Sequence, residues 1–102
     1  MSAPDKLDCP SRTTELLAMS LAEATRARWE DGRARYGDDW SARHPLVEAY
    51  LEVVDLRNYL REAERQGAID AWLLRRFMVA INPLARELLW HARVAVAEVD
   101  DA

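Results

Sequence analysis

Several carboxylates fall on one face of the segment between residues 45 and 66. At about 100° per residue in a helix, Glu48, Glu52, Asp55 and Glu62 lie within roughly 80° of one another. Carboxylates so placed can hold Mg²⁺ through their oxygens, and waters and substrate phosphates then complete the octahedral shell. This pattern predicts a magnesium site for phosphoryl-group chemistry, with Glu48, Glu52 and Asp55 as the metal ligands.

Two arginines on the flank of the same helix are candidate substrate-binding residues. Arg57 and Arg61 can meet phosphate oxygens if a nucleotide binds at the metal. The alternative is an ordinary amphipathic helix whose acids face water, because an apolar set lies nearly opposite: Leu46, Tyr50, Val53, Leu60 and Ala63. Tyr59 falls in the middle of the acids, which favours partial cover by protein.

The run of residues 48–60 resembles the second acidic helix of the MazG-like, all-α nucleoside triphosphate pyrophosphohydrolases. Glu52 and Asp55 match the Glu-x-x-Asp signature of that helix. Residues 33–37, Trp40 and residues 44–46 also resemble short MazG-like or uncharacterised proteins that phages and prophages carry. The resemblance covers about a third of the chain.

The resemblance implies Mg²⁺ bound by acids on two adjacent helices and hydrolysis of a nucleoside triphosphate to the monophosphate and pyrophosphate, commonly in a dimer or larger assembly. Glu52 and Asp55 become metal ligands, and Glu48 is an extra acid one turn before them. The family's other helix supplies Glu-x-x-Glu, a motif missing here, because the acids at positions 15, 23 and 30 are eight and seven residues apart. The chain is then a diverged or inactive relative, or the likeness is an accident of composition.

The competing function is that of a non-enzymatic interaction protein. A small acidic helical chain rich in tryptophan suits a phage-type or mobile-element accessory protein that binds and inhibits a host protein, as an anti-defence factor does, with its acidic face towards a basic partner surface. A structural subunit of a larger assembly is a third possibility. An enzyme needs the acids to face those of the first helix across a cleft, whereas a binding protein needs them outward on an open surface.

Four helices are expected, together with three breaks. The first begins at Ser11, Thr13 or Thr14 and ends near residues 32–37. The second starts at His44-Pro45 and ends before Gly67, and the third covers residues 68–81. Asn82-Pro83 ends the third helix and caps the fourth. We expect an all-α bundle in one domain of residues 11–102, preceded by a flexible tail of residues 1–10.

The composition of the chain limits the binding partners and the cellular compartment that we expect for it. The net charge of −4, without a basic block, argues against nucleic acid as a partner. Cys9 is alone, which excludes an internal disulfide and fits a reducing cytoplasm. No apolar run approaches the roughly 20 residues that span a bilayer, so no membrane contact is expected.

The last helix carries a second apolar stripe, formed by Trp90, Val94 and Ala97. Such a helix is either central in the bundle or shared with a second subunit, and a chain this short has difficulty surrounding one of its own helices. A homodimer is therefore favoured. The four tryptophans are expected to be core or interface anchors, and His91 a structural histidine rather than a catalytic base.

Overall fold

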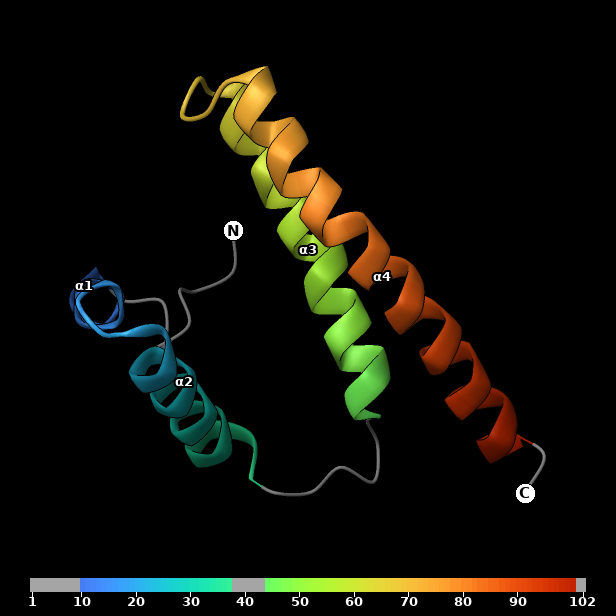
Figure 1. The fold of residues 1–102 in the computed structure, drawn as a ribbon. Helices are drawn as coiled ribbons and strands as arrows, with labels where there is room; N and C mark the ends of the chain where they lie inside the picture. The colour runs from blue at the N-terminus through green and yellow to red at the C-terminus, as the bar shows by residue number, and fades with distance from the viewer. Residues whose placement is uncertain (1–9, 38–43, 101–102) are drawn as a thin grey trace. The chain divides into compact units, whose positions relative to one another are not determined.

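A computed structural model describes residues 10–37 and 44–100 of the chain (Figure 1). The regular structure in these ranges consists of four helices: α1 (Pro10–Leu17), α2 (Leu21–Tyr36), α3 (Pro45–Arg65) and α4 (Ala71–Asp100). The prediction of an all-α protein with about four helices is confirmed.

The contacts divide the chain between Asp39 and Trp40 into two compact units. The first unit holds α1 and α2, and the second holds α3 and α4, so each is described by itself. The single domain predicted over residues 11–102 stays a prediction. Of the tail predicted over residues 1–10, residues 1–9 lie outside the described residues, as does Trp40.

The first unit corrects the prediction of one long N-terminal helix. The chain leaves α1 after Leu17, and Ser20 caps a new helix with a capping box. The Glu23 backbone N–H donates to Ser20 Oγ at 3.2 Å, and the Ser20 backbone N–H donates to Glu23 Oε1 at 3.0 Å. These bonds satisfy two backbone donors at the start of α2, and so they favour a break where apolar periodicity alone suggested continuity.

Helix α3 follows its sequence signals. His44 is the N-cap residue and its Nδ1 accepts a hydrogen bond from the Leu46 N–H at 3.1 Å, while Pro45 occupies the first turn. At the other end, Gly67 has φ 80°, and the Ala68 N–H donates to the Ala63 carbonyl at 2.8 Å. This pair of features is a Schellman motif, so the predicted C′ role of Gly67 is confirmed.

Helix α4 replaces the two helices expected after Gly67. Asp70 caps it, because its Oδ1 accepts the Leu73 N–H at 2.8 Å, and the helix then continues for 30 residues with Pro83 inside. The predicted break at Asn82-Pro83 is therefore wrong. A helical proline leaves the carbonyl four residues earlier without its donor. That residue is Val79, which is 70% exposed on the outer side of α4, and the helix continues past Pro83 in spite of the missing bond.

The second unit is an antiparallel hairpin of α3 and α4, which run side by side (Figure 1). Half-buried apolar side chains of both helices meet along it, including Tyr50, Val54, Ile81 and Leu89. Only Ala92 and Ala95 are buried among the described residues, at 6% and 9% exposed. The hairpin therefore packs one row from each helix and leaves much of its large apolar surface exposed.

The turn between α3 and α4 allows a direct test of backbone strain. A Cβ at either Gly67 or Gly32 would meet no atom within 4 Å, but only Gly67 has a positive φ. We expect Gly67→Ala to lower the free energy of unfolding of the hairpin by about 1 to 2 kcal/mol. Gly32→Ala, within α2, should be neutral or stabilising by up to about 1 kcal/mol. Urea denaturation of both variants checks the contrast, and equal effects would contradict it.

The capping box of α2 gives a second prediction. The backbone N–H and the side chain of Ser20 hold the pKa of Glu23 below its ordinary value. The ionised cap therefore contributes stability above the pKa of the unfolded chain, and loses it as the pH falls through the folded pKa. Ser20→Ala should raise the pKa of Glu23 and destabilise α2 by about 1 kcal/mol, while Ser20→Thr keeps the acceptor. NMR titration of the Glu23 carboxyl in the unchanged chain and in both variants measures this pKa. An unchanged Glu23 pKa in Ser20→Ala would refute the role of the Ser20 side chain.

Candidate functional site

The acids predicted as metal ligands lie on the outward side of α3. The half-buried residues at the middle of this helix, Val53, Val54 and Arg57, face α4, and the helical period places Glu52 and Asp55 on the opposite side, where both are exposed. Glu48 is half-buried in the first turn of the helix. The outward position is the arrangement that the sequence analysis associated with a binding protein.

Glu62, the fourth acid of this face, is engaged in local contacts. Its carboxylate accepts hydrogen bonds from the Arg65 guanidinium and, at 3.0 Å, from Gln66 Nε2. Arg65 and then Gln66 hold the pKa of Glu62 below its ordinary value. Glu62 thus stabilises the C-terminal turn of α3 instead of joining Glu52 and Asp55.

No metal centre is assembled within residues 10–37 and 44–100. No group of three or more His, Cys, Asp or Glu side chains there is close enough to hold an ion. The physical reason within the hairpin is that α4 contacts the side of α3 opposite to Glu52 and Asp55, so it brings no further ligand to them. The predicted roles of Glu48, Glu52 and Asp55 stay predictions.

The two arginines predicted to bind phosphate are separated from these acids. Arg57 is half-buried on the side of α3 that faces α4, and its Nε is buried without a hydrogen-bond partner. Arg61, four residues after Arg57, is exposed. Arg57 therefore does not share a surface with Glu52 and Asp55.

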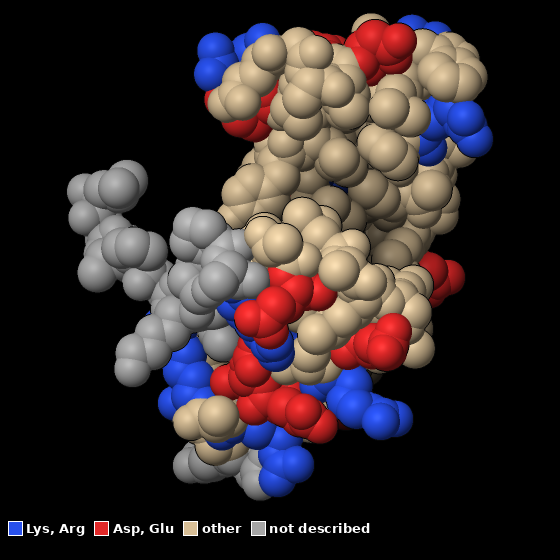
Figure 2. All heavy atoms as spheres, turned by 90° about the vertical axis from the view of Figure 1, so that its left-hand side faces the viewer, with Lys and Arg blue, Asp and Glu red and all other residues tan. Residues whose placement is uncertain are grey.

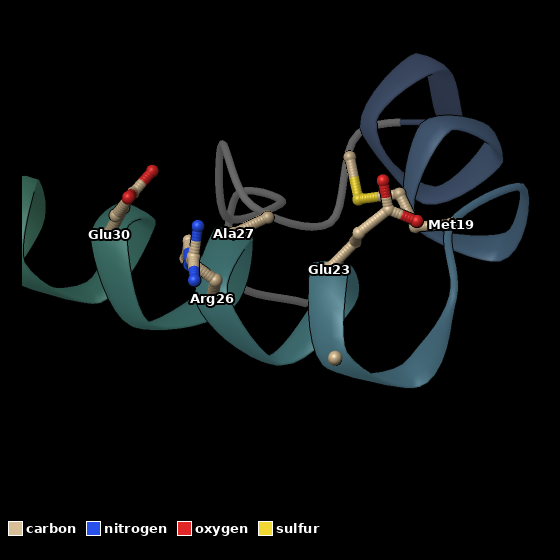
Figure 3. A pocket seen from close by; sticks show the side chains of 6 residues that line it. Met19, Glu23, Arg26, Ala27 and Glu30 are labelled. Atoms are coloured by element: carbon tan, nitrogen blue, oxygen red, sulfur yellow. The ribbon is translucent and has the colours of Figure 1, made fainter.

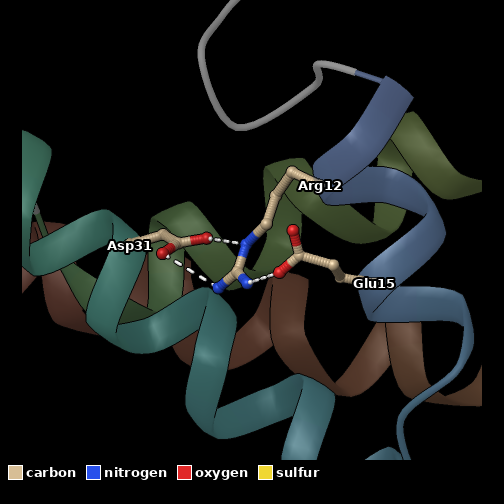
Figure 4. Close-up of polar contacts among 3 residues, drawn as sticks. All are labelled: Arg12, Glu15 and Asp31. Atoms are coloured by element: carbon tan, nitrogen blue, oxygen red, sulfur yellow. Dashed lines mark hydrogen bonds and ion pairs between the residues drawn. The ribbon is translucent and has the colours of Figure 1, made fainter.

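In the first unit, Arg12 joins α1 to α2 through two hydrogen bonds and makes a third within α1 (Figure 4). Its Nε and Nη2 donate to the two carboxylate oxygens of Asp31 at 2.8 and 3.1 Å, and its Nη1 donates to Glu15 Oε2 at 2.9 Å. Asp31 and then Glu15 raise the pKa of Arg12. This forked contact fixes the angle between the two short helices and occupies Glu15, one of the acids considered for the missing motif.

The other two acids of α2 border an open depression of about 260 Å³, lined by Met19, Ala22, Glu23, Arg26, Ala27 and Glu30 (Figure 3). Glu23 is bound to Ser20 in the capping box, and Arg26 stands between Glu23 and Glu30. A cation between the two carboxylates would meet this guanidinium. The depression thus offers no replacement for the missing Glu-x-x-Glu pair.

The outer edge of α4 carries a stripe of large apolar residues, which extends the predicted stripe of Trp90, Val94 and Ala97 towards the start of the helix. We define this outer edge by Trp72, Val79 and Trp90, which are 60%, 70% and 60% exposed. Seven and eleven residues separate them, so they share the side of α4 turned away from α3. The longer stripe depends on one helix continuing through Pro83, which explains why the prediction of two separate helices found only its C-terminal part.

Two polar contacts hold the tryptophans of the outer edge in place. The Arg76 guanidinium lies over the Trp72 ring, 4.9 Å from its centroid. The His91 ring meets Trp90 edge-on with centroids 4.8 Å apart, and His91 Nε2 lies 3.7 Å from Glu87 Oε2. These contacts reduce the side-chain freedom that a partner would otherwise have to restrict.

Three arginines run beside the outer edge of α4. Arg75, Arg86 and Arg93 are exposed, and none of them has an ion pair or hydrogen bond with another described residue. A shallow hollow of about 390 Å³ lies between Pro83, Arg86, Glu87 and Trp90. Exposed tryptophan beside unpaired arginine is the combination of side chains enriched at the energetic centres of protein interfaces.

Comparison with known proteins shows no matching family, no matching curated protein and no matching solved structure. The MazG-like resemblance of residues 48–60 therefore stays a prediction. Among the described helices, none has the length and apolar character needed to cross a membrane.

The outward position of Glu52 and Asp55 predicts weak metal binding. Two exposed carboxylates one turn apart lack the further ligands of a built site, so we expect no saturable Mn²⁺ binding below about 1 mM. Electron paramagnetic resonance of Mn²⁺ with the full chain, and with Glu52→Ala/Asp55→Ala beside it, measures this. Saturable binding that the double variant abolishes would show that other parts of the chain or a second copy complete the site.

Proposed function

We propose that this chain is a non-enzymatic binding protein, which uses the outer edge of α4 to bind another polypeptide. The observation that carries the proposal is the stripe of Trp72, Val79 and Trp90 on the exposed side of a long helix. Large apolar side chains in one row bind well to the apolar face of a partner helix. The fixed tryptophan rings provide anchors of the kind that dominate such interfaces.

The charges beside this stripe specify the chemistry of the partner. Arg75, Arg86 and Arg93 are without carboxylate partners among the described residues. A partner that places apolar residues on the stripe and carboxylates beside these arginines would satisfy both features. An acidic amphipathic helix therefore fits best. The earlier expectation, a basic partner on the acidic face of α3, stays a prediction, as do the phage-type role and the inhibition of a host protein.

Mg²⁺-dependent hydrolysis of nucleoside triphosphates is the competing proposal. It is supported by the resemblance of residues 48–60 and by the accessibility of Glu52 and Asp55, which are one turn apart on α3. It requires at least one further carboxylate from outside the hairpin, because α4 provides none on that side. It also leaves the tryptophan stripe unexplained, and for this reason we prefer the binding protein.

Substitution of the tryptophans separates binding from fold. The partner in this test is a polypeptide that the full chain captures from lysate. Trp72→Ala and Trp90→Ala should each weaken its binding by about 30-fold, the effect of losing roughly 2 kcal/mol at an interface anchor. Both side chains are largely exposed, so helix content should not change. Trp29→Ala is the matched control, because Trp29 is 55% exposed but lies on α2. Surface plasmon resonance with the polypeptide captured from lysate, at low and high salt, measures the change.

The outcomes distinguish the two proposals. Binding that is lost in both tryptophan variants, retained in Trp29→Ala and weakened by salt supports the binding protein. Equal binding by all variants would exclude the outer edge of α4 as the site. Mg²⁺-dependent release of pyrophosphate from nucleoside triphosphates, abolished by Glu52→Ala/Asp55→Ala, would instead establish the enzyme.

A further inference from the structure

Two grooves run between α3 and α4, one on each side of the hairpin, and one of them carries a second apolar surface. The other groove contains a hollow of about 380 Å³, lined in part by Val47, Tyr50, Leu89 and Val96. The helical period then assigns residues to the remaining groove, because side chains on the other flank of each helix must lie there. The residues of that groove form what we call the uncharged face.

Helix α3 contributes a regular apolar row to the uncharged face. The row consists of Ala49, Val53, Leu56, Leu60 and Ala63, at intervals of four and three residues. This is the spacing that lets one helix pack along another over many turns. Leu56, at the centre of the row, is 42% exposed, so α4 does not cover it.

Helix α4 contributes a matching row. It consists of Leu73, Phe77, Ala80, Leu84 and Leu88, at intervals of three and four residues. Phe77 and Leu84 are 38% and 52% exposed. No charged residue falls within either row. In the upper part of Figure 2, which holds the turn end of the hairpin, red and blue atoms border a central area of other residues.

We propose that a second copy of this chain covers the uncharged face, so that two hairpins form a four-helix bundle. The face is roughly 30 Å long, from about 20 residues of helix, and about 20 Å wide, from two helix diameters. It would bury roughly 600 Å² on each copy, and the total of about 1,200 Å² reaches the lower limit of specific interfaces. The twofold operation places apolar rows on apolar rows, and the half-buried Arg57 and Glu64 lie beside the α3 row, on its side towards α4.

The small extent of burial among the described residues supports the same occupant. No large side chain is fully buried among the described residues. A hairpin of two helices cannot bury enough apolar surface by itself, whereas a bundle of four encloses one row from each helix. In such a bundle the rows of α3 and α4 would lie in the shared core, whereas in a single hairpin they face water.

The first unit is a poorer occupant for the uncharged face. Its exposed large apolar residues on α2 are Leu21, Trp29 and Tyr36, at intervals of eight and seven residues. Arg26 and Arg33 fall on the same half of the helix between them. The exposed apolar residues of α2 therefore alternate with arginines and do not form a continuous row like those of α3 and α4. The dimer also leaves the outer edge of α4 accessible, since that edge lies on another side of the helix.

Charged substitutions on the uncharged face test the dimer. In a Cys9→Ser background, which excludes disulfide-linked dimers, the full chain should sediment with twice the 11.7 kDa mass of one chain. Leu56→Glu and Leu84→Glu should each weaken dimerisation at least about 100-fold, because every substitution places two unpaired carboxylates in the interface. Val79→Glu is the control: it adds the same charge to α4 on the outer edge and should leave the mass unchanged.

Isotope-filtered NMR of mixed labelled and unlabelled chains keeps the test decisive if a variant fails to fold. Intermolecular contacts from the methyl groups of Leu56 and Leu84 would support the dimer. A monomer at every concentration, or contacts from Leu84 to α2 of the same chain, would overturn it. The result is independent of partner binding, because Trp72→Ala and Trp90→Ala should weaken capture of a polypeptide without dissociating the dimer.

Discussion

The packing of α3 against α4 is the interaction on which the rest of the structure depends. Ala92 and Ala95 are the only buried positions among the described residues, at 6% and 9% exposed, and the other apolar side chains of the hairpin are half-buried or exposed. One helix can cover only one stripe of another. Since α4 is apolar over much more than one stripe, the same contact that forms the hairpin leaves a groove and an outer edge exposed.

The ends of the helices show which structural features can be predicted from sequence patterns alone. His44-Pro45 and Gly67 determine the ends of α3 by local backbone chemistry, so their roles could be predicted from residue type. The capping box of Ser20 and Glu23 is equally local, but a continuous apolar pattern concealed it. Pro83 is different, because whether a proline ends a helix depends on the exposure of the carbonyl it leaves unpaired, and exposure is a property of the fold.

The candidate site could be predicted only in part for a similar reason. The period of α3 correctly places Glu52 and Asp55 on one face, since one helix determines their spacing. A metal site or a phosphate site also needs groups from a second element, and no pattern within α3 specifies which side of it α4 covers. Arg57 illustrates the limit: a flank residue by sequence, it lies half-buried towards α4.

The charges of the hairpin are divided between its two helices in a way that fits an assembly. The outward side of α3 is acidic through Glu52 and Asp55, while Arg75, Arg86 and Arg93 accompany the outer edge of α4. The surface between these two edges carries the apolar rows of α3 and α4, so apolar packing can occur there without desolvating Glu52, Asp55 or the three arginines. A twofold dimer formed on that surface would display each edge twice. Two equivalent sites on one particle raise the apparent affinity for a repeated or multivalent partner without any new contact, because the second binding event becomes intramolecular.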